Sequence, residues 1–234
     1  MRNFFRILNN FTDQSFGMRF QPSPEARLGR VRLKLIEDYQ CNVVIDVGAN
    51  DGCWALDLRK SGYDKEIVSY EPSEAFYKLK SRANLDSLWT VHNMALTDVS
   101  NFTSFYIASN NNLSSSTLAP KEILNQHPQI RFRVGQKVPS IRLDSQVFKD
   151  GNLYLKIDTQ GSEFKVLKGA IKLFSRISVI EFESALTELY DGEKNHYFIS
   201  QFLLKNGFRP RQVVVTHWDK DLATISIDSI FSRS

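Results

Sequence analysis

The chain has 234 residues, of which 42% are hydrophobic and 24% are charged, so it can bury the core of one large globular domain. Its net charge of +4 is small and its Lys and Arg residues are scattered, which argues against a nucleic-acid partner. No segment approaches the ~20 apolar residues of a membrane-spanning helix. Cys41 and Cys53 have no metal-ligand spacing to another Cys or to a His. They indicate a reducing compartment, and we expect a cytoplasmic protein.

Residues 1–40 are expected to form an N-terminal helical segment ahead of the main domain, residues 41–234. Within residues 1–11, aromatic and aliphatic side chains recur at helical spacing, with two arginines between them. An uninterrupted apolar stretch and a small-residue cleavage site are both missing, so no signal peptide is expected. Such a helix packs on its own domain, packs on a second copy in a homo-oligomer, or lies on a membrane surface. The sequence leaves these three alternatives open.

Strands and helices alternate from Ser23 onward. A helix begins at Ser23-Pro24, and its basic residues (Arg27, Arg30, Arg32 and Lys34) are expected to form a solvated face. Residues 43–47 are an unbroken β-branched run, typical of a strand buried on both faces of a parallel sheet. Further strands are expected at 67–70, 88–92, 153–157, 178–182, 213–215 and 222–227, and further helices through Leu56 and Leu58 and at 73–85, 164–174 and 196–206. The alternation predicts an α/β fold with a Rossmann-like, doubly wound, mainly parallel sheet.

Residues 97–150 interrupt this alternation after the third strand. Two strand-like pieces, 102–108 and 138–143, flank a polar stretch at 109–116. Long inserts of this kind carry specificity, form lids or serve as mobile connectors. We therefore expect a single domain with an insertion at about residues 97–150, rather than two domains.

A turn with two glycines follows the first buried strand and opens a helix. It reads Asp46-Val47-Gly48-Ala49-Asn50-Asp51-Gly52, and Gly48 and Gly52 permit a tight turn whose amides can face a ligand. The spacing does not match the G-x-G-x-x-G pattern of dinucleotide-binding turns. The acidic residues Asp46 and Asp51 would repel a pyrophosphate but favour a cationic sulfonium. The turn therefore predicts S-adenosylmethionine rather than NAD.

Glu71 ends the second predicted strand. A carboxylate at this place can accept hydrogen bonds from both hydroxyls of a ribose. NAD-dependent enzymes use the same device, so Glu71 alone does not distinguish the two cofactors. Together with Asp46 and Gly48, it predicts a nucleoside site at the carboxyl edge of the sheet.

The ordered set of motifs resembles the FkbM-type methyltransferase family over about residues 43–222. The most specific stretch is Lys156-Ile157-Asp158-Thr159-Gln160-Gly161-Ser162-Glu163. The other matching stretches are Val44-Ile45-Asp46-Val47-Gly48-Ala49-Asn50, Tyr70-Glu71-Pro72, Asn93-Met94-Ala95-Leu96, Ser114-Ser115-Ser116, Arg142-Leu143-Asp144, Val166-Leu167-Lys168-Gly169-Ala170, Glu181-Phe182-Glu183 and Leu189-Tyr190. Ser162 stands where the family often has an aromatic residue, which leaves the shape of the acceptor site open.

The resemblance implies a methyltransferase that uses S-adenosylmethionine. The family is associated with methyl transfer to oxygen, commonly on a sugar, a glycan or another small hydroxylated acceptor. By this likeness the cofactor contacts residues of three segments, which are Asp46, Gly48, Ala49, Asn50 and Gly52 in the turn, Glu71 and Pro72 after the second strand, and Asn93 and Ala95 after the third.

Methyl transfer to a neutral hydroxyl requires in-line alignment and a proton acceptor. Lys156 and Asp158 lie two residues apart at the end of one predicted strand, and Glu181 and Glu183 do so on the next. We expect Asp158 to be the base or a ligand of the acceptor hydroxyl, with Glu183 beside it. Lys156 either holds an acceptor oxygen or forms a structural ion pair, for instance with Glu181. No metal site is predicted, because no His joins these carboxylates in the sequence.

Histidines and Glu163 are secondary candidates. His196 and His217 lie near the expected rim of the cleft and are lesser candidates for the base. His92 is expected to be structural, and Glu163 to complement a helix dipole. Two other classes of function stay open at this point, an NAD-dependent oxidoreductase and a non-catalytic protein that keeps the fold.

Overall fold

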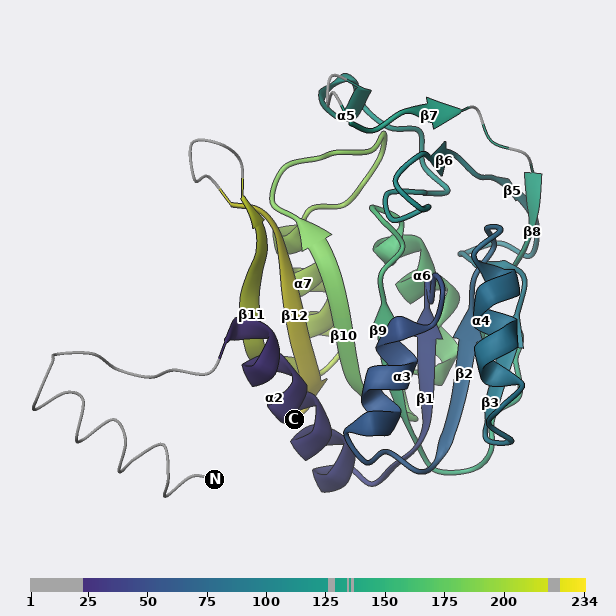
Figure 1. Cartoon of the computed structure of the whole chain (residues 1–234). Coiled ribbons are helices and arrows are strands. Elements are labelled where there is room, and N and C mark those ends of the chain that lie inside the picture. The colour runs from purple at the N-terminus through teal and green to yellow at the C-terminus, as the bar shows by residue number, and fades with distance from the viewer. Residues whose placement is uncertain (1–22, 126–128, 134, 136, 219–223) are drawn as a thin grey trace, which may run out of the picture.

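The computed structural model describes residues 23–125, 129–133, 135, 137–218 and 224–234. Its centre is a seven-stranded sheet with the order β11-β12-β10-β9-β1-β2-β3 (Figure 1). Five strands are parallel: β1 (Cys41–Val47), β2 (Glu66–Tyr70), β3 (Trp89–His92), β9 (Asn152–Ile157) and β10 (Ile177–Ala185). The strand β12 (Thr224–Arg233) pairs antiparallel with both of its neighbours, β10 and β11 (Phe208–Trp218). The predicted mainly parallel α/β fold is thereby confirmed.

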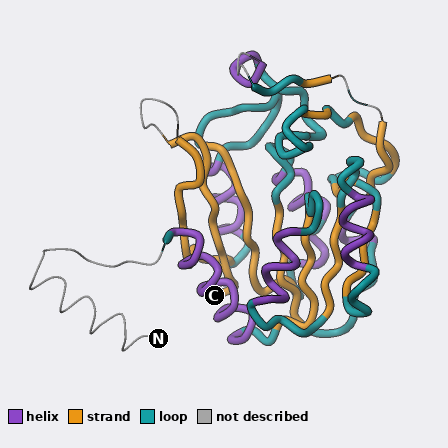
Figure 2. The backbone as a smooth tube through the Cα atoms, viewed as in Figure 1, coloured by secondary structure: helices purple, strands orange, loops and turns teal. Residues whose placement is uncertain are grey.

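Helices cover both faces of this sheet (Figure 1, Figure 2). The helices α2 (Pro24–Asp38), α3 (Cys53–Lys60) and α4 (Phe76–Ala83) lie on one face, and α6 (Glu163–Gly169) and α7 (His196–Lys205) lie on the other. Alternate residues of β1 enter the two cores, because successive side chains of a strand point to opposite faces. Val43 and Ile45 pack with α6 and α7, whereas Val44 packs with α2, α3 and α4. Burial on both faces explains why the strand has no polar alternation.

One predicted helix and the two predicted closing strands differ from the structure in their bounds. The helix expected at 164–174 ends at Gly169, and a 3₁₀ turn (Ile171–Leu173) follows. Gly169 packs so closely on another segment that an added Cβ would lie 2.1 Å from the carbonyl oxygen of Thr97. The closing strands are much longer than predicted, because β11 lies at the sheet edge and its exposed side chains break the apolar pattern used to find it.

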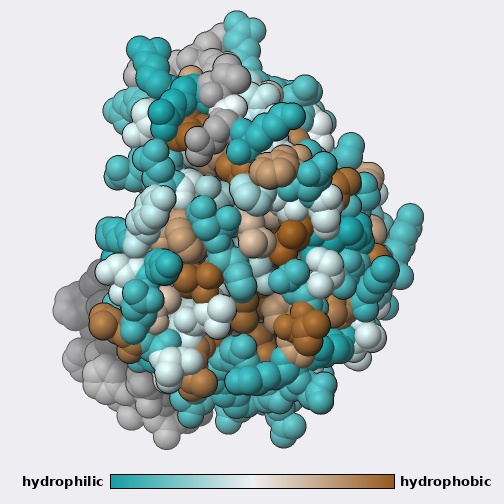
Figure 3. Space-filling model, turned by 90° about the vertical axis from the view of Figure 1, so that its right-hand side faces the viewer, coloured by the Kyte–Doolittle hydropathy of each residue, from teal (hydrophilic) through white to brown (hydrophobic). Residues whose placement is uncertain are grey.

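The residues between β3 and β9 form a small cap above the carboxyl ends of the central strands (Figure 1). It contains a three-stranded sheet, β4 (Ala95–Leu96), β8 (Lys137–Ile141) and β5 (Asn101–Ser104), and the pair β6 (Ile107–Ala108) and β7 (Phe132–Arg133). A short helix α5 (Glu122–Asn125) and a 3₁₀ turn (Leu143–Ser145) complete it. On the side of α4 and β5, apolar side chains also reach the surface (Figure 3), among them Leu85, Leu88 and Phe102.

Helix α2 begins as predicted, with the Ser23 hydroxyl accepting a hydrogen bond from the amide of Ala26. Its basic residues are not all solvated, however. Arg32 is partly buried, with its side chain 15% exposed, and donates two hydrogen bonds to the carboxylate of Glu181 on β10. Most of the predicted N-terminal segment, residues 1–22, lies outside the described residues. None of the described helices is long and apolar enough to cross a membrane.

Candidate active site

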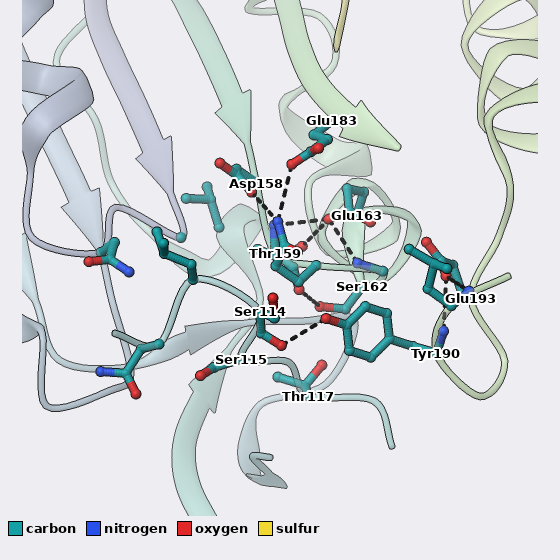
Figure 4. A pocket seen from close by; sticks show the side chains of 18 of the residues that line it. Ser114, Ser115, Thr117, Asp158, Thr159, Ser162, Glu163, Glu183, Tyr190 and Glu193 are labelled. Atoms are coloured by element: carbon teal, nitrogen blue, oxygen red, sulfur yellow. Dashed lines mark hydrogen bonds between the residues drawn. The ribbon is translucent and has the colours of Figure 1, made fainter. Parts of the chain in front are cut away.

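A cavity of about 470 Å³ lies at the carboxyl ends of β1, β2, β9 and β10, beneath the cap (Figure 4). The strand order reverses at this place, since β1 pairs with β2 on one side and with β9 on the other. Open α/β sheets bind ligands at such a point. The volume lies within the range of pockets for small molecules and cofactors.

Gly48 allows two strand ends to meet at the cavity floor. Its φ is +75°, and an added Cβ would lie 1.8 Å from the carbonyl oxygen of Asp158. The amides of Gly48 and Ala49 donate to the carbonyl of Tyr70, so they hold the turn to β2 instead of facing a ligand. Gly52 caps α3 and packs against Leu79 and Trp89 away from the cavity. The turn thus presents mainly Gly48 and Asn50 to the cavity.

Glu71 lies in the cavity wall with both carboxylate oxygens fixed by the backbone. Oε2 accepts the amide of Asn50 and Oε1 accepts the amide of Ser73, each at 2.8 Å. Burial raises the pKa of Glu71 above its ordinary value, although these hydrogen bonds oppose the shift. Because each oxygen has a second lone pair, the carboxylate can still accept hydrogen bonds from a ligand.

The wall next to Glu71 is apolar. It is formed by Tyr70, Pro72, Met94, Ala95 and Leu96, of which Pro72 and Ala95 are predicted cofactor residues. Asn93 is set back from the cavity, where its side chain donates to the Glu71 carbonyl and fixes the segment after β3. An apolar wall beside a carboxylate that can accept hydrogen bonds from a ribose is suited to the base of a nucleoside.

Asp46 and Lys156 lie behind the cavity wall as a buried ion pair. The Lys156 Nζ lies 3.2 Å from Oδ1 of Asp46 and 3.4 Å from Oδ2 of Asp158. Burial lowers the pKa of Lys156, but the two carboxylates outweigh burial and raise it, so the ammonium stays charged. The alternative ion pair of Lys156 with Glu181 is wrong, because Glu181 is held by Arg32 and by the hydroxyl of Tyr154.

Asp158 and Glu183 meet at the cavity through one bridging side chain (Figure 4). The amide nitrogen of Gln160 donates to Oδ1 of Asp158 at 2.8 Å and to Oε2 of Glu183 at 3.1 Å. Burial raises the pKa of Asp158; Lys156 opposes the shift but does not cancel it. Burial also disfavours ionised Glu183, but hydrogen bonds from His217 and Ser226 outweigh it and lower the pKa of Glu183. The two carboxyl groups are thus tuned in opposite directions.

Glu163 closes the loop that carries Gln160. Its Oε1 accepts the amide and hydroxyl of Thr159 and the amide of Gly161, while Oε2 has no partner among the described residues. Burial raises the pKa of Glu163 to about 8. The predicted dipole role is therefore only part of its function, since the side chain also fixes the backbone that presents Gln160.

The cap and the loop after β10 form the far wall of the cavity. The Tyr190 hydroxyl donates to the carbonyl of Ser114 at 2.7 Å, which ties this loop to the cap (Figure 4). Glu193 accepts the amides of Leu189 and Tyr190 and so shapes the same loop. Sequence reasoning missed Gln160, Tyr190 and Glu193. The motif that contains Gln160 was visible, but its bridging role requires the spacing of β9 and β10.

Of the two histidines that are candidates for the base, the structure places His217 at the cavity and His196 away from it. His217 lines the cavity, with Nδ1 3.4 Å from Oε1 of Glu183, and this hydrogen bond raises its pKa. His196 bonds Ser184 and Ser200 through its two ring nitrogens and stacks on Phe182, so its role is structural. His92, expected to be structural, stacks on the ring of Tyr70, and His127 lies outside the described residues. Among the described residues, no group of three or more His, Cys, Asp or Glu side chains could hold a metal ion.

Comparisons with known proteins agree with this geometry. A family model described as "Methyltransferase FkbM domain" matches residues 46–210. A solved FkbM methyltransferase from Methylobacillus flagellatus is similar with a TM-score of 0.50 and 15% identity. The match covers 81% of this chain but only 43% of that chain, so the present chain spans less than half of its length. A search of curated proteins found no match.

A second solved structure matches over nearly the whole length of both chains. It is magnesium protoporphyrin IX methyltransferase from Synechocystis with bound S-adenosylmethionine. The TM-score is 0.50 at 14% identity, and the match covers 98% of this chain and 97% of the other. At this identity the likeness concerns the fold alone.

Proposed function

The chain belongs to the FkbM methyltransferase family, and we propose that it transfers the methyl group of S-adenosylmethionine to a hydroxyl of a sugar, a glycan or a similar small acceptor. The observation that carries this proposal is the carboxyl pair Asp158 and Glu183. Gln160 bridges it, and it lines the same cavity as Glu71. The cavity thus combines a nucleoside-type half with a half suited to proton transfer.

The residues present fit S-adenosylmethionine. Glu71 is fixed by two backbone amides at the end of β2, as a ligand of ribose hydroxyls would be. The apolar wall of Met94, Ala95 and Leu96 suits the adenine. The close approach of Gly48 to the Asp158 carbonyl leaves no side chain between the cofactor half and the carboxyl pair. S-Adenosylmethionine would supply an electrophilic methyl group on a sulfonium there.

Asp158 is the base in this proposal. It would accept the proton of the acceptor hydroxyl when the oxygen takes the methyl group that S-adenosylmethionine would supply, with S-adenosylhomocysteine as the leaving group. A pKa raised by burial brings the carboxylate closer to the pH at which a base works well. Lys156 positions Asp158 from behind, and Glu183, held charged by Ser226 and His217, orients the acceptor hydroxyl.

The competing oxidoreductase is disfavoured by the turn after β1. A dinucleotide pyrophosphate is held by free amides at such a turn. Here the amides of Gly48 and Ala49 already donate to Tyr70, and the amide of Asn50 donates to Glu71. The other alternative is a protein that keeps the fold but transfers no methyl group, and the two experiments below distinguish it from an active enzyme.

Calorimetric titration with S-adenosylhomocysteine tests the cofactor half. Glu71→Ala is expected to weaken binding about 10- to 100-fold, because it removes hydrogen bonds to a charged group. Glu74→Ala, an exposed carboxylate three residues away, is the matched control and should bind as the wild type does. NADH should not bind. If the wild-type protein fails to bind S-adenosylhomocysteine, the proposed function is wrong.

Transfer of a ¹³C-labelled methyl group to a panel of sugars and glycans tests the acceptor half. The product should carry an O-methyl signal, and Asp158→Asn should lower kcat about 10²- to 10⁴-fold while S-adenosylhomocysteine binding persists. Asp57→Asn, on the exposed face of α3, controls for the same chemical change. Full kcat in Asp158→Asn would remove Asp158 from the role of base. Cofactor binding without any transfer would favour an inactive relative.

A further inference from the structure

The charge of the cavity restricts which acceptors can enter it. This inference rests on the proposed function, because it concerns the acceptor half of the same site. We propose that the acceptor is a neutral or positively charged polyhydroxyl compound, such as a sugar or an amino sugar, and that sugars carrying phosphate, sulfate or carboxylate are excluded from the acceptor half of the cavity, around Asp158 and Glu183.

Acidic groups dominate the described residues of the cavity wall. Five of them are carboxyl groups, Glu71, Asp158, Glu163, Glu183 and Glu193, of which Glu163 has a pKa raised to about 8 and is uncharged at neutral pH. None of the described lining residues is Lys or Arg, and the basic side chain among them is that of His217, which is engaged with Glu183. Proteins that bind phosphate or carboxylate groups of ligands use Arg, Lys or free backbone amides. The described lining contains no Arg or Lys for such a group.

The nearest buried cations are already neutralised. Lys156 lies behind the wall between the carboxylates of Asp46 and Asp158. Arg32 on α2 is paired with Glu181 on β10. Neither cation lines the cavity, so neither is available to an anionic substituent of the acceptor.

The acidic cluster is itself under repulsion. Asp228 on β12 lies directly opposite Glu183 on β10, and burial together with the charge of Glu183 raises the pKa of Asp228 to about 8. A further anion would add to this repulsion, which is stronger for groups that are shielded from water. An ammonium group would instead relieve it, and an uncharged hydroxyl would leave it unchanged.

The uncharged part of the wall suits hydroxyl groups. It contains the hydroxyls of Ser114, Ser115, Thr117, Ser184 and Ser226. The Thr117 hydroxyl is buried and has no hydrogen-bond partner among the described residues. A buried hydroxyl without a partner is costly, and a hydroxyl of the acceptor would satisfy it. Apolar side chains of Leu189 and Ile225 complete a surface of the kind that contacts a sugar ring.

Saturation-transfer NMR on the enzyme loaded with S-adenosylhomocysteine tests the proposal without turnover. The probes are glucose, glucosamine, glucose 6-phosphate and glucuronate, which share one ring. Glucose and glucosamine should bind at least ten-fold more tightly than the two anions, a ratio that corresponds to about 1.4 kcal/mol. Equal or tighter binding of the anions would overturn the proposal, and so would failure of both glucose and glucosamine to bind.

A pair of variants of equal side-chain length tests the electrostatic cause. Ile225 lines the acceptor half next to Ser226. Ile225→Lys should improve binding of glucose 6-phosphate about ten-fold and weaken that of glucosamine, whereas Ile225→Met should keep the wild-type preference. Binding of S-adenosylhomocysteine reports whether each variant is folded. If Ile225→Lys does not fold, the comparison of the four probes on the wild-type protein still decides the question.

The two proposals fail in different ways. Loss of S-adenosylhomocysteine binding in the wild-type protein refutes the methyltransferase itself. Normal cofactor binding and O-methylation of a phosphorylated sugar inside the same cavity refute only the inference about acceptor charge.

Discussion

Glu163→Gln is expected to stabilise the protein at pH 8 and to leave its stability almost unchanged at pH 5. Glu163 is 1% exposed, and burial raises its pKa from 4.5 to about 8. Gln keeps the Oε1 acceptor for Thr159 and Gly161, and its amide nitrogen replaces the oxygen that has no partner. The substitution therefore removes the charge while it preserves the loop geometry.

The size of the effect follows from proton linkage. Between pH 4.5 and pH 8 the unfolded chain ionises Glu163 while the folded protein keeps it protonated, so the free energy of unfolding falls as the pH rises. For these two pKa values the fall between pH 5 and pH 8 is about 3.5 kcal/mol. The Gln variant lacks this contribution, so its advantage over the wild type should grow by about 3.5 kcal/mol between pH 5 and pH 8.

Urea unfolding followed by tryptophan fluorescence at pH 5, 6, 7 and 8 measures this difference. Glu37→Gln, the same change at an exposed position of α2, is the control and should run parallel to the wild type. Parallel stability curves for the wild type and Glu163→Gln would show that Glu163 is ionised throughout, and the reasoning about its burial would be refuted.

Three further predictions concern backbone packing, buried charge and pH. Gly48→Ala should lower the free energy of unfolding in urea by about 3 kcal/mol more than Gly192→Ala does. Both glycines have positive φ, but an added Cβ would clash only at Gly48, with the Asp158 carbonyl. Equal losses in the two variants would mean that the backbone shifts to make room. Arg32→Met should lower the free energy of unfolding by about 3–5 kcal/mol, because it leaves the Glu181 carboxylate without its cation, and adding Glu181→Gln should restore part of the loss. If Arg32→Met alone does not change the stability, water reaches Glu181. The kcat for methyl transfer should rise with pH through a pKa above the ordinary range of an aspartate, since Asp158 must be unprotonated to act; a flat profile would point to another base.

Local sequence patterns predicted the fold and the position of Glu71 at the carboxyl edge of the sheet. The uninterrupted apolar run of β1 predicts a strand buried on both faces, and the structure places it at the centre of the sheet. Glu71 at the end of β2 is a local signal as well, because chain position relative to a strand end fixes which edge of the sheet a side chain reaches. Such features depend on neighbours in the sequence, so local patterns report them.

The partners of charged side chains were decided by tertiary structure. Arg32 looks like a residue of a solvated helix face, yet it pairs with Glu181, which is 149 residues away in the chain. One alternative paired Lys156 with Glu181, and strand register places Lys156 between Asp46 on β1 and Glu181 on β10. Arg32 and Tyr154 already hold Glu181, so Lys156 pairs with Asp46 instead. The bridge from Gln160 to Glu183 likewise exists only because β9 and β10 are neighbours. Sequence periodicity tells which face a residue occupies, whereas the choice of partner on that face depends on strand order, register and helix placement, which pack residues from distant parts of the chain.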